Sequence, residues 1–274
     1  MTFLYLGLTS KVGNFLGYNK NMKLKIIIIL FICFFCDNIA SAKQILPDSI
    51  QKITTTISAP LSGQKGKLYF ICSSGRKCST EDAVKDYYQN KGYKVMRGEV
   101  TFWQGMFALA FYDEIFAINK YSYSDIPSDM FSPNFYPNRK GSIDKKYEYL
   151  KSANLHEYIN KQLKAHEETN TRLLTDAAID KSENCIEFFK TPIVQEFLKK
   201  IKSAIFAKIV YRIAQNVGEN RAGTPDFVIW NNKKMIFVEV KREKETLRDG
   251  QIEWLEFLIK NNIPCLVTRV KGMN

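Results

Sequence analysis

Apolar and polar positions form their clearest pattern near the end of the chain. Residues 227–230 and 235–238 are almost entirely β-branched, aromatic or aliphatic, and the polar segment 231–234 lies between them. Residues of these types favour strands, and a polar break of this length is typical of a turn between two strands. The pattern therefore predicts a hairpin that is apolar enough to be buried on both faces.

In two longer segments, apolar residues recur at intervals of three and four, which predicts amphipathic helices. The first helix should cover residues 102–116, and the second should cover residues 192–216 with Pro192 at its first position. A shorter helix is expected to begin at Ser79, a hydroxyl cap followed by acidic residues, and to end near Asn90. The same criteria predict further elements: strands at 67–72 and 265–270, and a helix at 249–261.

The remaining segments show weaker periodicity. Residues 43–66 are rich in Ser, Thr, Pro and Gly, which predicts a linker or a loosely packed arm. Residues 144–190 are rich in lysine and glutamate, and we expect exposed helices there. The expected organisation is an arm at 43–79, a mainly helical region at 80–190 and a C-terminal core at 191–274.

The first 42 residues have the pattern of a targeting segment. A basic start at 22–25 precedes a continuous apolar run at 26–36, and Ala40-Ser41-Ala42 is typical of a cleavage site. This order predicts a secretory signal peptide cleaved after Ala42, and therefore a periplasmic or secreted protein. The apolar run is short for a transmembrane span, and a cytoplasmic or membrane-tethered N-terminus is the alternative.

Charge and motif content narrow the classes of partner. Forty Lys and Arg against 28 Asp and Glu give a net charge of +12, which favours a polyanion such as nucleic acid or an anionic membrane. No G-x-x-x-x-G-K-[ST] motif is present, so we expect no nucleotide cofactor and no ATP-driven activity.

The cysteines indicate one possible disulfide. Cys72 and Cys78 could close a small loop in an oxidising compartment, and two cysteines without a second pair do not make a zinc site. Cys265 lies in a predicted core strand, where a buried free thiol is expected.

Charged residues at the end of the apolar hairpin are unexpected, because a buried charge is costly unless it is paired or binds a metal. Glu239 and Lys241 are two residues apart and share one face of their strand, and Asp226 begins the neighbouring strand. Two carboxylates can supply oxygen ligands to Mg²⁺ or Mn²⁺, and a lysine beside the metal can orient a water molecule. For an isolated E-x-K, a surface salt bridge is the alternative interpretation.

The neighbouring sequence favours the metal site. Pro225-Asp226, Glu239-Val240-Lys241 and Gln251-Ile252-Glu253-Trp254 together resemble the PD-(D/E)xK nucleases. They are most similar to the virus-type replication-repair nuclease (VRR-NUC) family, and the segment from Arg221 to Asp226 fits that family's R-x-G-x-P-D pattern. Residues 80–271 also resemble, more weakly, the C-terminal part of the Fanconi-associated nucleases.

This resemblance implies an α/β fold, in which a restriction-endonuclease-like mixed sheet is flanked by helices and preceded by a helical region. It also implies a DNA nuclease that uses Mg²⁺ or Mn²⁺ and acts on flapped or branched ends. The site residues that follow are the metal ligands Glu99, Asp226, Glu239 and the carbonyl of Val240, the catalytic residues Asp226, Glu239, Lys241 and Gln251, and the DNA-contacting Arg221.

The sequence departs from the family at two positions and leaves other functions open. Arg242 stands where the family usually has glycine, and Gly250 stands where it usually has a basic residue. A non-catalytic DNA-binding module of the same fold is one alternative function. An envelope protein whose basic surface meets anionic lipid is another.

Overall fold

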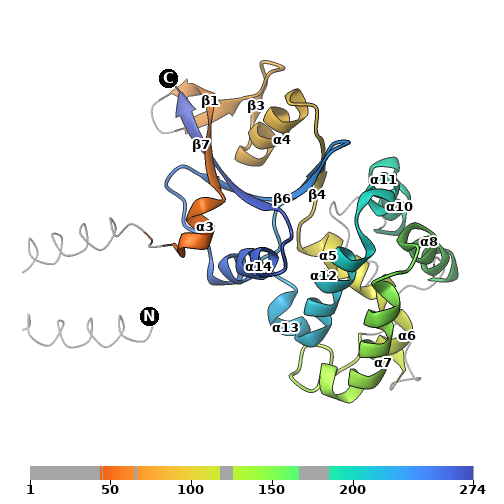
Figure 1. The fold of residues 1–274 in the computed structure, drawn as a ribbon. Coiled ribbons are helices and arrows are strands. Elements are labelled where there is room, and N and C mark those ends of the chain that lie inside the picture. Colours follow the sequence, from red (N-terminus) through yellow and green to blue (C-terminus); the bar gives the residue numbers. More distant parts are fainter. Residues whose placement is uncertain (1–43, 45, 65–66, 118–125, 167–184, 274) are drawn as a thin grey trace, which may run out of the picture. The chain divides into compact units, whose positions relative to one another are not determined.

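The sheet that holds the predicted hairpin is larger than the sequence indicates. In the computed structural model, which describes residues 44, 46–64, 67–117, 126–166 and 185–273, seven strands form one mixed sheet in the order β3-β2-β1-β7-β6-β5-β4 (Figure 1). The strands are β1 (Thr54–Gln64), β2 (Lys67–Ile71), β3 (Lys77–Cys78), β4 (Lys94–Arg97), β5 (Phe227–Trp230), β6 (Met235–Arg242) and β7 (Cys265–Met273). The predicted signal peptide at 22–42 lies outside the described residues.

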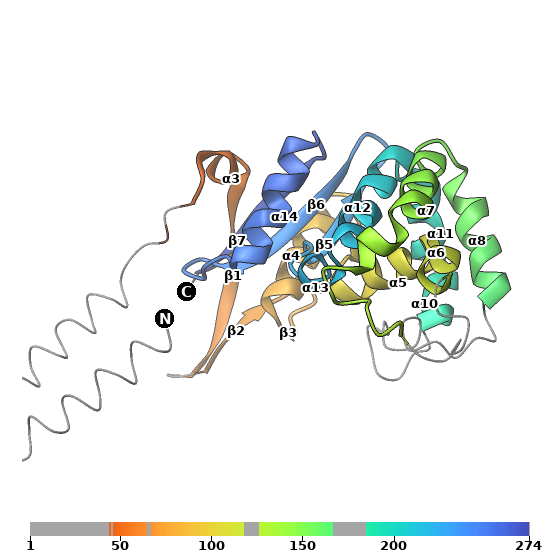
Figure 2. The same ribbon diagram turned by 90° about the horizontal axis from the view of Figure 1, so that it is seen from below.

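Helices lie on both faces of the sheet and in a group beside it (Figures 1 and 2). Helix α4 packs on β2, β6 and β7, whereas α14 packs on β7 and on α3. The helices of the described residues are α3 (Asp48–Lys52), α4 (Thr80–Asn90), α5 (Val100–Ala110), α6 (Tyr112–Phe116), α7 (Phe135–Leu150), α8 (Leu155–His166), α10 (Cys185–Lys190), α11 (Pro192–Lys200), α12 (Ser203–Gln215), α13 (Val217–Asn220) and α14 (Asp249–Lys260).

The predicted hairpin is confirmed. Strands β5 and β6 are antiparallel with Trp230 opposite Met235, and all four residues of β5 are buried. Asn231 closes the turn, because its side-chain oxygen accepts hydrogen bonds from the backbone N–H groups of Lys233 and Lys234 at 2.8 and 3.1 Å. The β-branched pattern and the turn residue together account for this element.

Aromatic contacts attach the helical group to the hairpin. Trp103 of α5 stacks on Phe237 of β6 with ring centroids 6.0 Å apart, and Phe197 of α11 lies 6.2 Å from Trp230 of β5. All four side chains are almost fully buried. The helices that precede the hairpin in the chain therefore share one apolar core with it.

The expectation of a loosely packed arm at 43–79 is wrong. Strand β1 lies inside the sheet between β2 and β7, parallel to β7, with Thr54 opposite Val267 and Pro60 opposite Met273. Ile57 and Ala59 are buried while their polar neighbours are exposed, so a strand alternation exists, but small and hydroxyl residues weaken its signal. The sheet therefore also draws on the residues before 191, where the expected core begins.

Both long predicted helices are interrupted. The helix predicted at 102–116 divides at Phe111 into α5 and α6, and the helix predicted at 192–216 divides at 201–202 into α11 and α12. Ile201 and Lys202 are extended, and the Ser203 hydroxyl donates to the carbonyl of Ala153 at 2.8 Å. An apolar period of three and four continues across such breaks, because each new helix again faces the core.

The cysteine predictions agree with the structure. Cys72 and Cys78 form a disulfide with their Cα atoms 6.0 Å apart, within the usual range for such bonds. Cys265 is a buried free thiol, and burial raises its pKa to about 11. Within the described residues, no helix has both the length and the apolar character needed to cross a bilayer.

Gly223 fixes how the loop before β5 approaches helix α14. Its φ is +90°, and a Cβ atom at this position would lie 2.5 Å from the carbonyl oxygen of Gly250. Only glycine combines this backbone conformation with such close contact. The loop that carries Asp226 is therefore held against the first turn of α14.

Gly223→Ala should lower the free energy of unfolding by more than about 2 kcal/mol, because the new methyl group meets backbone at an unfavourable φ. Gly141→Ala is the matched control, since nothing lies within 4 Å of a Cβ there and the residue is in the interior of α7. That control should stabilise the protein by about 0.5–1 kcal/mol. Urea titrations of both variants measure the two changes, and equal stabilities would contradict the close-contact argument.

Candidate active site

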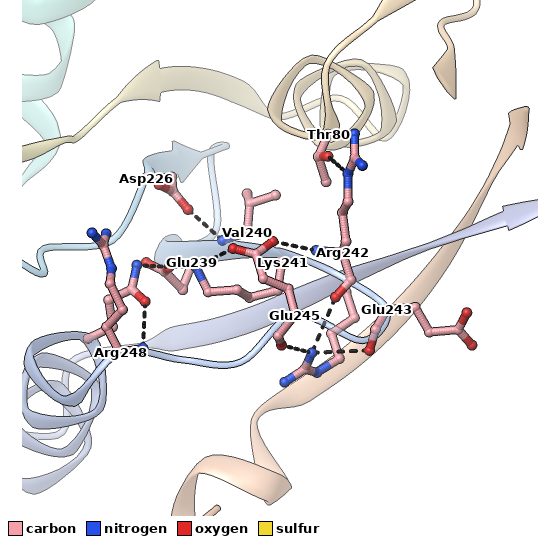
Figure 3. A network of polar contacts seen from close by, with 11 residues as sticks. Thr80, Asp226, Glu239, Val240, Lys241, Arg242, Glu243, Glu245 and Arg248 are labelled. Carbon is pink, nitrogen blue, oxygen red and sulfur yellow. Dashed lines mark hydrogen bonds and ion pairs between the residues drawn. The ribbon is translucent and has the colours of Figure 1, made fainter. Parts of the chain in front are cut away.

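Asp226 lies at the junction of three segments of the chain. Its Oδ2 accepts a hydrogen bond from the backbone N–H of Val240 in β6 at 2.6 Å (Figure 3). Its own carbonyl accepts from the N–H of Gly98, at the end of β4, at 2.8 Å. The residue before β5 is thus tied to both neighbouring strands, which sets the position of its carboxylate.

Glu239 and Lys241 lie on one face of β6, as predicted from their spacing. Both are buried, with relative exposures of 1% and 5%. The Lys241 Nζ donates to Glu239 Oε1 at 2.8 Å, and the Gln251 Nε2 donates to the same oxygen at 2.5 Å. The surface salt bridge considered for an isolated E-x-K is therefore excluded, because this pair is inside the protein.

Gln251 comes from the first turn of α14. It is buried, and its Oε1 accepts from the backbone N–H of Arg248 at 3.0 Å. With the amide oxygen fixed in this way, the amide nitrogen points toward Glu239. Four predicted residues, Asp226, Glu239, Lys241 and Gln251, are thus brought together by the loop before β5, by β6 and by α14.

Burial dominates the electrostatics of the two carboxylates. It raises the pKa of Asp226 to about 6, against the lowering effects of the Val240 N–H and the Lys241 charge. Burial and the nearby Asp226 also raise the pKa of Glu239 above its usual range. Two adjacent carboxylates in an apolar site resist ionisation, and a bound cation would reverse that preference.

The donor set fits a hard divalent cation. Glu239 Oε2 is buried and has no hydrogen-bond partner in the described part of the chain. The N–H and C=O of a strand residue point to the same side, so the carbonyl of Val240 faces the side on which its N–H meets Asp226. Carboxylate and carbonyl oxygens are the ligands that Mg²⁺ and Mn²⁺ prefer.

Glu99 lies next to this group without joining it. It is the N-cap residue of α5, and its carboxylate is 3.5 Å from the guanidinium of Arg97. It directly follows Gly98, whose N–H donates to the carbonyl of Asp226, and its charge contributes to the raised pKa of Asp226. The described residues contain no group of three His, Cys, Asp or Glu side chains arranged to hold a metal, so a third carboxylate ligand stays a prediction.

Arg221 is exposed at the end of α13. Its guanidinium lies over the ring of Phe131, 4.6 Å from the centroid, and Phe131 is itself exposed. This pairing keeps the arginine at the surface on the segment that leads to Asp226. The contact with Phe131 could not be predicted, because 90 residues of chain separate the two.

Two contacts at the site involve residues whose positions could not be predicted from the sequence. Arg242, a departure from the family pattern, donates through Nε to the hydroxyl of Thr80 at 3.1 Å. Glu245 lies 3.5 Å from Lys241 Nζ. The only local signal for the second contact was the spacing of four residues between a lysine and a glutamate.

Comparisons with known proteins agree with the resemblance carried by the motifs. Residues 173–272 match the family model of the VRR-NUC domain. The Fanconi-associated nuclease 1 homolog of Caenorhabditis elegans is 30% identical over 214 residues, which are 72% of this chain and 24% of the relative. The homolog of Schizosaccharomyces pombe is 24% identical over 70% of this chain and 27% of its own length. The chain thus spans about a quarter of the length of these relatives.

Solved structures confirm the expected α/β fold. The crystal structure of paFAN1 bound to DNA with a one-nucleotide 5′ flap and a gap matches with a TM-score of 0.66 and 20% identity, over 85% of this chain and 40% of that chain. The complex with a two-nucleotide 5′ flap matches with a TM-score of 0.62 and 18% identity, over 85% and 39%. None of these comparisons supports the predicted signal peptide.

The raised pKa of Asp226 predicts a pH dependence of stability in EDTA. An unfolded aspartate titrates near pH 4, and folding raises this pKa to about 6, so the folded state binds more protons between these values. The free energy of unfolding should therefore fall by about 2 kcal/mol as the pH rises from 4 to 6 because of this group.

Asp226→Asn should remove that part of the pH dependence while keeping an oxygen for the N–H of Val240. Urea unfolding of both proteins in EDTA at several pH values measures the difference. Identical pH profiles for the wild type and the variant would show that Asp226 titrates normally.

Proposed function

We propose that the protein is a DNA nuclease dependent on Mg²⁺ or Mn²⁺. Its residues 173–272 match the family model of the VRR-NUC domain. The observation that carries the proposal is the buried Glu239. Its Oε2 has no hydrogen-bond partner among the described residues and lies in a site shared with Asp226. A pure DNA-binding module has no need of buried acids, because phosphate affinity comes mainly from Lys and Arg.

Asp226, Glu239 and the carbonyl of Val240 would hold the cation, with Glu99 as a further carboxylate ligand. When bound, a divalent cation polarises the scissile phosphate and acidifies a water molecule. Both carboxylates must be ionised for this, and the cation supplies the positive charge that their buried position lacks.

The other residues orient the reacting groups. Lys241 has a hydrogen-bonding ammonium beside Glu239, where it would position the attacking water and offset charge that develops on the phosphate. Gln251 fixes the direction of the Glu239 carboxylate from the first turn of α14. A side chain held on two sides loses little freedom when the substrate binds.

DNA with a flap or branch is the proposed substrate class. The structural neighbours are paFAN1 complexes with 5′ flap DNA, and the relatives are named as Fanconi-associated nucleases. The net charge of +12 suits a polyanion, and the exposed Arg221 on the approach to the site would contact a phosphate.

Labelled linear, flapped and plasmid DNA should be cleaved with Mg²⁺ or Mn²⁺ and left intact in EDTA. Glu239→Ala and Asp226→Ala should each abolish cleavage and leave DNA affinity largely unchanged, since neither residue carries a positive charge toward phosphate. Glu256→Ala, an exposed glutamate of α14, serves as the control and should retain wild-type activity. Undiminished cleavage by either active-site variant would remove the nuclease proposal, whereas DNA binding without cleavage by the wild type would favour the binding module.

Glu99→Gln tests the third carboxylate. We expect the rate of cleavage to fall at least about tenfold, with more Mn²⁺ needed for the half-maximal rate, because one metal ligand is weakened. Arg97→Gln is the control for loss of the Arg97–Glu99 ion pair alone. A wild-type metal dependence in Glu99→Gln would leave Glu99 as the N-cap of α5 and nothing more.

A further inference from the structure

Within the part of the chain that the structure describes, Lys241 has two carboxylate partners. Its Nζ is 2.8 Å from Glu239 Oε1 and 3.5 Å from Glu245 Oε1. Under the proposed function, Glu239 is a metal ligand. A bound cation would compete with Lys241 for the negative charge of Glu239, so the Glu239–Lys241 interaction would weaken. A second carboxylate would then be needed to keep the ammonium in place.

Glu245 is held in a fixed orientation by the turn that follows β6 (Figure 3). The N–H of Glu245 donates to the carbonyl of Arg242 at 3.0 Å, and the N–H of Arg242 donates back to Glu245 Oε2 at 3.1 Å. One carboxylate oxygen thus closes the turn while the other faces Lys241. A freely rotating surface glutamate would make neither contact persistently.

Arg269 of β7 fixes the same turn to the sheet. Its Nη1 lies within hydrogen-bond distance of three backbone carbonyls, those of Arg242, Glu243 and Glu245, at 3.3, 3.2 and 2.7 Å. The N–H of Glu243 also donates to the carbonyl of Val270 at 3.0 Å. Strand β7 therefore fixes the position of this turn, and of Glu245, relative to the sheet.

We propose that Glu245 is a positioning residue that holds the ammonium of Lys241 in its working place while Glu239 binds the metal. This inference rests on the proposed nuclease function. Glu245 is half-exposed, at 51%, so water offsets the cost of its charge and it has no need of a cation of its own. It acts through Lys241 and touches neither metal nor DNA.

Glu245→Gln separates this role from a structural one, because the amide oxygen still accepts from Arg242 while the charge facing Lys241 is lost. We expect kcat to fall about tenfold, with unchanged KM, unchanged Mn²⁺ half-saturation and unchanged Tm. Glu243→Gln is the matched control, since Glu243 lies in the same turn and pairs with Lys271 at 3.7 Å instead. It should behave as the wild type.

A double-mutant cycle tests whether Glu245 acts through Lys241. In a Lys241→Gln background, Glu245→Gln should cause no further loss of kcat. An equal loss in both backgrounds, a wild-type kcat in Glu245→Gln, or a reduced affinity for Mn²⁺ would each overturn the proposal. A lowered Tm in Glu245→Gln would make the residue structural.

A readout independent of cleavage separates this inference from the nuclease proposal. In Mg²⁺-saturated protein, acetic anhydride should label Lys241 several-fold faster in Glu245→Gln than in the wild type or Glu243→Gln, because the flexible amine is no longer held by Glu245. Peptide mass spectrometry measures the labelling. Faster labelling without any DNA cleavage by the wild type would support the positioning of Lys241 while the nuclease proposal failed. Equal labelling in all three proteins would reject the role of Glu245.

Discussion

The site depends on one energetically unfavourable feature, the burial of the Glu239 carboxylate within an apolar sheet. Moving such a charge out of water costs several kcal/mol even after the protein relaxes. Lys241 and Gln251 both contact one oxygen of this carboxylate, and the other oxygen has no partner in the described part of the chain. The surroundings therefore offset only part of the cost, which is the condition under which a cation binds strongly.

Other features of the fold follow from holding that carboxylate in place. The loop before β5 approaches α14 through Gly223, and α14 in turn directs Gln251 at Glu239. Asp226 ties β5 to the backbone of β6 beyond the point where the two strands pair. A side chain thus takes the place of strand pairing at the site, and the carbonyl of Val240 faces the same side as its N–H, toward Asp226.

The parts of the structure that could be predicted are those encoded over short distances. The β5–β6 hairpin, the shared face of Glu239 and Lys241, and the N-cap of α4 at Ser79 each depend on residues only a few positions apart. The family motifs added Gln251, which no local period indicates. The third predicted carboxylate, Glu99, follows the residue that bonds the carbonyl of Asp226, and the described residues leave its ligation of a metal open.

What could not be predicted depends on partners distant in sequence. Strand β1 is weakly apolar and needs β7 to form, and the breaks after Phe111 and Ile201 let each helix turn back on the core. The turn carrying Glu245 has an ordinary charged sequence, and contacts with Arg269 and Val270 on the neighbouring strand help to give it a defined shape.

The parallel pairing of β1 with β7 has a consequence for how the protein forms. Thr54 and Val267 are more than 200 residues apart, so β1 joins β7, the central strand of the sheet, only after nearly all of the domain has been synthesised. At ordinary translation rates, about 10–40 s separate the appearance of the two strands at the ribosome. During that interval, the edge of β1 that later pairs with β7 has no partner. The nascent chain is then most prone to pairing with the wrong strand.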